Sequence, residues 1–274
     1  MDWALVLASQ GIDAAIDDGT DGAGWALVVS TSDYPAAVQA IRQYRLENRH
    51  WHWRQPLRME GLVFDWRVML WAALMALFYW LSHVRNPGLE ATGCMDNAAV
   101  QAGEWWRLFT AMLLHADMAH LTANVSFGVV LLGLAMGRYG GGVGLLAAYL
   151  AGVVGNVAGL LFYPPSHQSL GASGMVMGGL GLLAAQSVAH LGRHPITRRH
   201  VIRGVLGGVM LFVLLGFGPG TDVLAHLGGF LTGLLFGAVL TRLPAGWQRP
   251  WTDIAAWLVF GGLIFATCWQ WLRF

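Results

Sequence analysis

The chain has 274 residues, of which 56% are hydrophobic and only 11% charged, and its formal net charge is +1. A soluble domain carries about 25% charged residues, so this composition excludes a water-soluble globular protein and predicts an all-α polytopic membrane protein. The near-neutral charge gives no indication of nucleic-acid binding. Every one of the 16 basic residues is arginine, which excludes a Ser–Lys pair as catalytic machinery.

Residues 1–60 differ from the rest and predict a small α/β domain. We expect short strands at 3–8 and 25–29, because both are short apolar runs and turn-forming residues lie between them. A helix should follow from about 33 to 48, with a serine or aspartate cap and a proline in its first turn. Nothing in this segment is a candidate site.

Apolar stretches dominate from residue 65 onward. A helix that crosses a membrane needs about 20 mostly apolar residues. On that criterion the sequence predicts seven spans, at about 66–84, 111–136, 141–163, 173–191, 201–217, 222–241 and 254–272.

The arginines orient these spans, because cytoplasmic loops carry an excess of basic residues. One side of the membrane receives Arg42, Arg45, Arg49, Arg54, Arg58, Arg67, Arg138, Arg193, Arg198, Arg199, Arg203, Arg242 and Arg249 if the chain alternates. The other side receives only Arg85, Arg107 and Arg273. We therefore expect the N-terminal domain in the cytoplasm and the C-terminus outside. Ser173, His120 and His226 would then all lie toward the outer side.

Ser173 is the candidate nucleophile, in the run Gly171-Ala-Ser-Gly174 that opens the fourth span. A helix start offers free backbone N–H groups that can stabilise an oxyanion. A hydroxyl needs a base, and His226 on the sixth span can serve. Asp222 lies one turn earlier and no acidic residue follows within the sixth span, which favours a Ser–His dyad over a triad. The alternatives are a helix-capping serine and a histidine that contacts a backbone carbonyl.

A stripe of small residues follows the candidate base. Gly229, Gly233 and Gly237 are spaced four apart after His226, a pattern that lets a neighbouring helix approach closely. A hydrogen bond between His226 and Ser173 requires such an approach of the fourth and sixth spans.

His120 and Asn124 are spaced i, i+4 and share one face of the second span. Both side chains can donate hydrogen bonds, so together with the backbone N–H of Ser173 they would form an oxyanion hole. The alternative is a metal site built from His115, Asp117 and His120. The two histidines are five residues apart rather than four as in zinc proteases, which disfavours that alternative.

Three further polar positions lie outside this constellation. His167, in the loop before the fourth span, is expected on the outer surface. Cys94 and Cys268 are both expected toward the outer face, and their positions leave open whether they form a disulfide.

Taken together, these residues resemble the rhomboid family of intramembrane serine proteases over about residues 62–240. The resemblance rests on Trp106-Arg107, His115 with His120 through Asn124, Gly171 through Gly174, and Ala225 through Gly229 with Gly233. Each motif is short, but all four occur in order and on the expected helices.

The resemblance implies a six-helix catalytic core at 61–241, a linker and seventh helix at 242–274, and a cytoplasmic domain at 1–60. It implies a Ser173–His226 dyad, an oxyanion hole that includes His120 and Asn124, and structural roles for Trp106, Arg107, Gly171, Gly174, Gly229 and Gly233. No metal or cofactor is implied. Substrates would be transmembrane proteins that enter past the fifth span and the loop at 216–222. The protein would be a multi-pass protein of a bacterial inner membrane.

One position departs from the family pattern, and two other functions are open. Many members carry an aromatic residue four positions after the serine, where this chain has Met177; a thioether can also pack on a ring, so we expect activity with a less rigidly held histidine. An inactive client-binding relative would usually lack the serine or the histidine. A proton-coupled transporter could use His120 and His226, but no internal repeat is visible.

Overall fold

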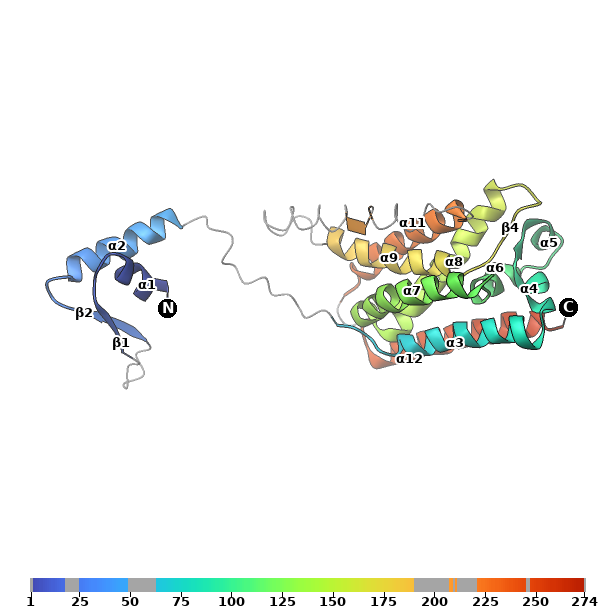
Figure 1. The fold of residues 1–274 in the computed structure, drawn as a ribbon, viewed down its shortest axis with the longest axis horizontal. Helices are drawn as coiled ribbons and strands as arrows, with labels where there is room; N and C mark the ends of the chain where they lie inside the picture. Colours follow the sequence, from blue (N-terminus) through green and yellow to red (C-terminus); the bar gives the residue numbers. More distant parts are fainter. Residues whose placement is uncertain are drawn as a thin grey trace. The chain divides into compact units, whose positions relative to one another are not determined.

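The computed structural model describes residues 2–17, 25–48, 63–189, 207–208, 210, 221–244 and 247–273. The chain divides into two compact units, 1–58 and 59–274 (Figure 1). The fifth predicted span, 201–217, lies almost wholly outside the described residues.

The first unit has two helices and one hairpin: α1 (Asp2–Ser9), β1 (Ala14–Asp17), β2 (Ala26–Val29) and α2 (Tyr34–Glu47). The strands pair antiparallel, with Ala14 opposite Val29. Leu7, Ile12 and Ala37 form the small core.

Two expectations for this unit are wrong. Residues 3–8 form the helix α1 and not a strand. A short apolar run without alternation has no period that separates the two structures, and here the helix buries Leu7 in the core. Asp33 precedes α2 but makes no side-chain cap, because its carboxylate accepts a hydrogen bond from Ser30 Oγ (2.7 Å). The strand at 25–29 and the helix at 33–48 are confirmed by β2 and α2.

Five helices among the described residues of the second unit are long and apolar enough to cross a membrane. They are α3 (Val68–Trp80) with its π-helical continuation η2 (Leu81–Arg85), α7 (Met118–Tyr139), α8 (Gly141–Phe162), α11 (Val223–Leu240) and α12 (Pro250–Trp271). A sixth apolar helix, α9 (Ser173–Ala189), is shorter. The protein is therefore a mostly helical, multi-pass membrane protein.

The helix of the second predicted span begins at Met118 rather than near residue 111. The reason is local: Asp117 adopts an extended conformation and its Oδ1 accepts a hydrogen bond from His120 N (2.7 Å), which is a helix N-cap. The preceding residues form a short 3₁₀ turn, η3 (Ala111–Leu113). The cap places His120 in the first turn of α7.

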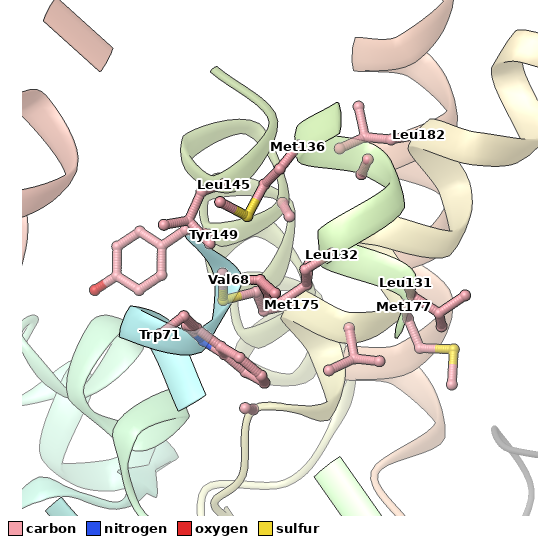
Figure 2. Packing of buried hydrophobic residues seen from close by; sticks show 14 of the residues in the cluster. Val68, Trp71, Leu131, Leu132, Met136, Leu145, Tyr149, Met175, Met177 and Leu182 are labelled. Atoms are coloured by element: carbon pink, nitrogen blue, oxygen red, sulfur yellow. The ribbon is translucent and has the colours of Figure 1, made fainter. Parts of the chain in front are cut away.

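Helix α9 lies in the middle of this unit and contacts α7, α8 and α11. Large side chains such as Trp71, Leu132, Tyr149 and Met175 are fully buried in the core around it (Figure 2). A helix surrounded in this way has a fixed position, and so does the residue at its start.

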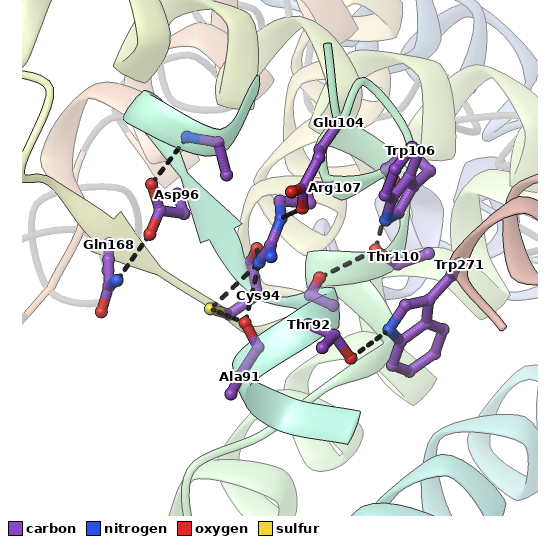
Figure 3. Close-up of polar contacts among 12 residues, drawn as sticks. Ala91, Thr92, Cys94, Asp96, Glu104, Trp106, Arg107, Thr110, Gln168 and Trp271 are labelled. Carbon is purple, nitrogen blue, oxygen red and sulfur yellow. Dashed lines mark hydrogen bonds and ion pairs between the residues drawn. The ribbon is translucent and has the colours of Figure 1, made fainter. Parts of the chain in front are cut away.

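The segment between α3 and α7 folds as a compact element, which we name the outer element after the side of the membrane on which the arginine pattern predicts it. It contains α4 (Gly88–Gly93), β3 (Met95–Asp96), α5 (Asn97–Gln101) and α6 (Arg107–Thr110). Figure 3 shows Arg107 at its centre: the buried guanidinium donates to Glu104 Oε2 (2.6 Å) and to the carbonyl oxygens of Ala91 and Cys94 (both 2.9 Å). Trp106 is also buried and belongs to a cluster with Leu114 and Trp271. Cys94 and Cys268 are both free thiols.

The outer element is joined to the chain just before Ser173. Strand β3 pairs antiparallel with β4 (Gln168–Ser169), and Asp96 accepts a hydrogen bond from Gln168 Nε2 (2.6 Å, Figure 3). Gly171 N donates to Ala111 O (2.9 Å). These contacts hold the loop that leads into α9.

Candidate active site

A cavity of about 760 Å³ opens between α7, α9 and α11. The four predicted site residues all line it: Ser173, His226, His120 and Asn124. Met177, His167 and Asp222 line it as well. Three helices that are far apart in the sequence thus bring a hydroxyl, two imidazoles and a carboxamide to one space.

Ser173 is the first residue of α9, so backbone N–H groups of the first helical turn lie beside its hydroxyl. The turn before it depends on Gly171, whose φ of +127° is a conformation that side chains with a Cβ rarely adopt. A Cβ on Gly171 would lie 2.7 Å from His120 Nε2 and 3.5 Å from Asn124 Nδ2. The His120 and Asn124 side chains therefore point at the backbone two residues before Ser173.

His226 is buried in the first turn of α11, and its backbone N–H donates to Asp222 O (3.0 Å). Close packing of α11 on α9 brings this turn to the start of α9. A Cβ on Gly229 would overlap with Gly174 O, and a Cβ on Gly233 would overlap with Gly178 O. Nothing larger than glycine fits at these two positions, which gives the predicted small-residue stripe a definite partner helix.

The same packing relates the two residues next to the candidate dyad. A Cβ on Gly174 would lie 3.5 Å from the carbonyl oxygen of Ala225. Gly174 follows Ser173 and Ala225 precedes His226, so the backbone segments that carry the hydroxyl and the imidazole lie beside each other.

Asn124 is 7% exposed, and within the described part of the chain its Nδ2 has no hydrogen-bond partner. A buried amide donor without a partner is costly. Such a group suits a site where a partner is present only transiently, as an oxyanion is. His120, one turn earlier on α7, is half-buried and lines the same wall.

His115 lies behind this wall. The sequence predicts it only as a motif residue or, alternatively, as a metal ligand. It is fully buried, its Nε2 accepts a hydrogen bond from Ala172 N (3.4 Å), and its ring packs edge-on against His120 at 5.2 Å. Burial lowers the pKa of His115 to about 3, so the ring is neutral at ordinary pH. It supports the backbone before Ser173 rather than facing the cavity.

The metal alternative finds no support in the geometry. Within the described residues, no group of three or more His, Cys, Asp or Glu side chains could hold a metal ion. His115 binds a backbone N–H, and Asp117 caps α7 through His120 N.

Met177 occupies the position predicted to pack near the base. It lies one helical turn after Ser173, is 3% exposed and lines the cavity together with His226. An apolar, flexible side chain therefore forms the cavity wall at this point.

The expectation for His167 is wrong. It lines the cavity instead of decorating the outer surface, because its Nε2 lies 3.1 Å from Asp222 Oδ2 and its ring stacks on Tyr163 at 4.1 Å. Asp222 in turn caps α11, since its Oδ1 accepts a hydrogen bond from Ala225 N (2.9 Å). Sequence spacing offered no signal for this pair, which is 55 residues apart.

Comparison with known proteins identifies the family of this chain. The model of the Rhomboid domain matches residues 102–243, more than half of the chain. The chain belongs to the rhomboid family.

Among its relatives are "Rhomboid protease GluP" of Bacillus subtilis, 31% identical over 188 residues, and "RHOMBOID-like protein 6, mitochondrial" of Arabidopsis thaliana, 32% identical over 164 residues. These matches cover 65% and 59% of this chain but only 35% and 52% of the two relatives. "Putative rhomboid protease YdcA" of Bacillus subtilis is 31% identical over 141 residues, 51% of this chain and 69% of that protein.

Proposed function

We propose that the protein is an intramembrane serine endopeptidase that hydrolyses peptide bonds in or near transmembrane segments of membrane proteins. Ser173 is the nucleophile and His226 the base. The observation that carries this proposal is the cavity that Ser173, His226, His120 and Asn124 line from three helices. The names of two relatives, "Rhomboid protease GluP" and "Putative rhomboid protease YdcA", point the same way.

In the acylation step, Ser173 Oγ attacks the carbonyl carbon of the scissile bond while His226 takes the hydroxyl proton. The oxyanion that forms accepts hydrogen bonds from the Ser173 backbone N–H, His120 and Asn124 Nδ2. The C–N bond then breaks, and His226 gives its proton to the departing amine. An acyl-enzyme on Ser173 remains.

Water completes the reaction. His226 takes a proton from a water molecule as the water attacks the acyl carbon, and it returns this proton to Ser173 Oγ as the ester bond breaks. The products are a free carboxylate and the restored hydroxyl. The open cavity supports this step, because hydrolysis within a membrane needs a route for solvent. The mechanism uses no metal ion or cofactor.

The proposed architecture is a six-helix core at 61–241, with α9 and the span at 201–217 among its helices, followed by α12 as a seventh helix. Residues 1–60 form a cytoplasmic domain and the C-terminus lies outside, in a bacterial inner membrane. The asymmetric distribution of arginine supports this orientation. The partners are transmembrane protein substrates and the surrounding lipid.

The decisive test is cleavage of a panel of transmembrane helices in liposomes by the wild type and by Ser173→Ala. We expect site-specific cleavage by the wild type and none by the variant. Ser126→Ala is the matched control. Ser126 is an exposed serine of α7 that does not line the cavity, so this variant should cleave normally. Cleavage by Ser173→Ala would contradict the assignment.

A fluorophosphonate separates a protease from a client-binding relative, because only an activated serine reacts with it. We expect labelling of the wild type and loss of labelling in both Ser173→Ala and His226→Ala. Client binding without any labelling of the wild type would favour an inactive, client-binding protein.

A further inference from the structure

The rim of the cavity contains an acidic residue whose two carboxylate oxygens both have partners. Asp222 Oδ1 accepts a hydrogen bond from Ala225 N (2.9 Å), one residue before His226. Asp222 Oδ2 lies 3.1 Å from His167 Nε2. The side chain is only 12% exposed, so little water competes for these contacts. One carboxylate thus joins the first turn of α11 to the loop that precedes α9.

His167 is itself held from several sides. Its ring stacks on Tyr163 at 4.1 Å, and its carbonyl oxygen accepts a hydrogen bond from Asn97 N (3.1 Å). The side chain of Asn97 donates to Tyr163 O (3.3 Å) and Pro164 O (3.1 Å). These contacts anchor His167 and its loop to the outer element.

The loop that holds His167 leads directly to the nucleophile. Two residues of β4 pair with β3, and Gly171 N donates to Ala111 O (2.9 Å). The position of Ser173 is consequently set by the same frame that holds His167. Asp222 links the first turn of α11, which carries His226, to the loop that holds His167.

We propose that Asp222 and His167 are positioning residues that set the distance and orientation of His226 relative to Ser173. This inference rests on the proposed function. We assign Asp222 a positioning role and not that of a third triad member, because the partners that the structure gives its two oxygens are Ala225 N and His167 Nε2. Its effect on catalysis passes through the backbone of α11. A displacement of about 1 Å in a catalytic group can cost about 100-fold in rate, so loss of this link is expected to show in kcat.

The experiment measures three quantities on the full-length protein in liposomes: kcat and KM for a cleaved transmembrane helix, the rate of Ser173 labelling by a fluorophosphonate, and Tm. His167→Phe keeps a ring to stack on Tyr163 but removes the nitrogen that meets Asp222. We expect kcat and the labelling rate to fall together by about 10- to 100-fold, with KM unchanged. His167→Gln, whose amide can donate to Asp222, should recover most of the loss.

Asp222→Ala should reproduce the loss seen with His167→Phe, and Asp222→Asn should be less affected because its amide oxygen can still cap α11.

The chain offers a closely matched control in Asp96. Its Oδ1 accepts from Ala99 N (3.0 Å) and its Oδ2 from Gln168 Nε2 (2.6 Å), so it also caps a helix and holds the same loop. That helix, α5, carries no residue of the cavity. In Asp96→Ala the backbone pairing of β3 with β4 still holds this loop and the first turn of α11 keeps its own cap, so kcat and the labelling rate should fall clearly less than in Asp222→Ala.

The outcomes separate this inference from the proposed function. A wild type without Ser173-dependent cleavage or labelling overturns both. An active wild type whose His167→Phe variant labels at the normal rate overturns the positioning role alone. Equal losses in Asp222→Ala and Asp96→Ala, in parallel with Tm, would also overturn it. Should Asp222→Ala fail to fold, the comparison of His167→Phe with His167→Gln decides the question.

Discussion

Asn124 presents a buried amide nitrogen that has no hydrogen-bond partner among the described residues, beside the turn that leads into Ser173. If it donates to an oxyanion, Asn124→Ala should lower kcat by about 10²- to 10³-fold, the usual effect of removing one such donor. KM should change little, because the donor acts mainly in the transition state. Steady-state cleavage of a transmembrane helix measures both constants.

Thr122→Ala is the control for this substitution. Thr122 lies on the exposed face of the same helix, and its hydroxyl donates only to Met118 O (2.7 Å). Its kcat should stay near the wild-type value. A kcat for Asn124→Ala that matched the control would remove Asn124 from the oxyanion hole.

Sequence analysis could identify those site residues whose polar side chains are costly in a membrane. Ser173 and His226 stand out for that reason among apolar neighbours, and the i, i+4 spacing pairs His120 with Asn124. His115 and His167 were not assigned their contacts, because both depend on backbone geometry outside regular helices. His115 meets Ala172 N only through the turn at Gly171, and His167 meets Asp222 across a loop.

The contact between α9 and α11 depends on glycines whose neighbours are backbone atoms. A Cβ on Gly233 would overlap with Gly178 O, and a backbone carbonyl in a packed helix cannot move aside as a flexible side chain can. Gly233→Ala should therefore separate the two helices and lower the fluorophosphonate labelling rate by about 10-fold or more, because His226 moves with α11. Gel fluorescence after timed exposure to the probe measures that rate.

Gly261→Ala tests whether the effect belongs to the contact and not to glycine in a helix. Gly261 lies on α12, and nothing would lie within 4 Å of its Cβ. This control should label normally and gain up to about 1 kcal/mol of stability from its higher helix propensity. Normal labelling of Gly233→Ala would show that the close approach of α9 and α11 is not needed for serine activation.

Helix α12 is tied to the outer element by its last tryptophan. Trp271 is 2% exposed, and its Nε1 donates to Thr92 Oγ1 (2.9 Å, Figure 3). Trp271→Phe removes the donor and part of the buried ring, so we expect a loss of at least about 1 kcal/mol, or at least about 2–4 °C in Tm for a unit of this size. Trp269→Phe is the control, since Trp269 is 51% exposed and should not change Tm. Equal Tm values for both variants would show that this hydrogen bond adds nothing to stability.

The membrane-spanning helices could be predicted from their length and apolar composition. The exact residue at which a helix begins depends on its N-cap, which apolar composition does not reveal. The spans at 66–84, 141–163, 222–241 and 254–272 agree with α3, α8, α11 and α12 to within a few residues, apart from the first four residues of α12. The predicted start of the second span lies seven residues before the start of α7. Residues 111–117 are apolar enough to continue a span, but they fold into η3 and the Asp117 cap. Tertiary contacts of the outer element decide that segment.

Three helices that are distant in sequence meet at one small polar network. Arg67, just before α3, pairs with Asp65 (2.6 Å) and with Asp253 of α12 (3.2 Å). Asp253 Oδ1 accepts a hydrogen bond from Gly142 N (2.6 Å) in the first turn of α8. The network therefore joins the ends of α3, α8 and α12, and its charge state bears on the stability of the membrane unit.

The Asp65 carboxylate makes this network sensitive to acid. The hydrogen bond from the Arg67 guanidinium lowers the pKa of Asp65 below its usual value near 3.8. A carboxyl whose pKa is lower in the folded state stabilises that state above the pKa of the unfolded chain, and the contribution is lost as pH falls through the folded-state value. Because the Arg67 side chain is half exposed, the contribution at neutral pH should not exceed about 1 kcal/mol.

Asp65→Asn should thus lower Tm slightly at pH 7, and the gap to the wild type should close as the pH falls below the usual carboxyl pKa near 3.8. Thermal unfolding in detergent, followed by tryptophan fluorescence at neutral and at acid pH, measures the gap. A gap that stays constant between neutral and acid pH would assign the effect to packing or hydrogen-bond geometry and not to the charge of Asp65.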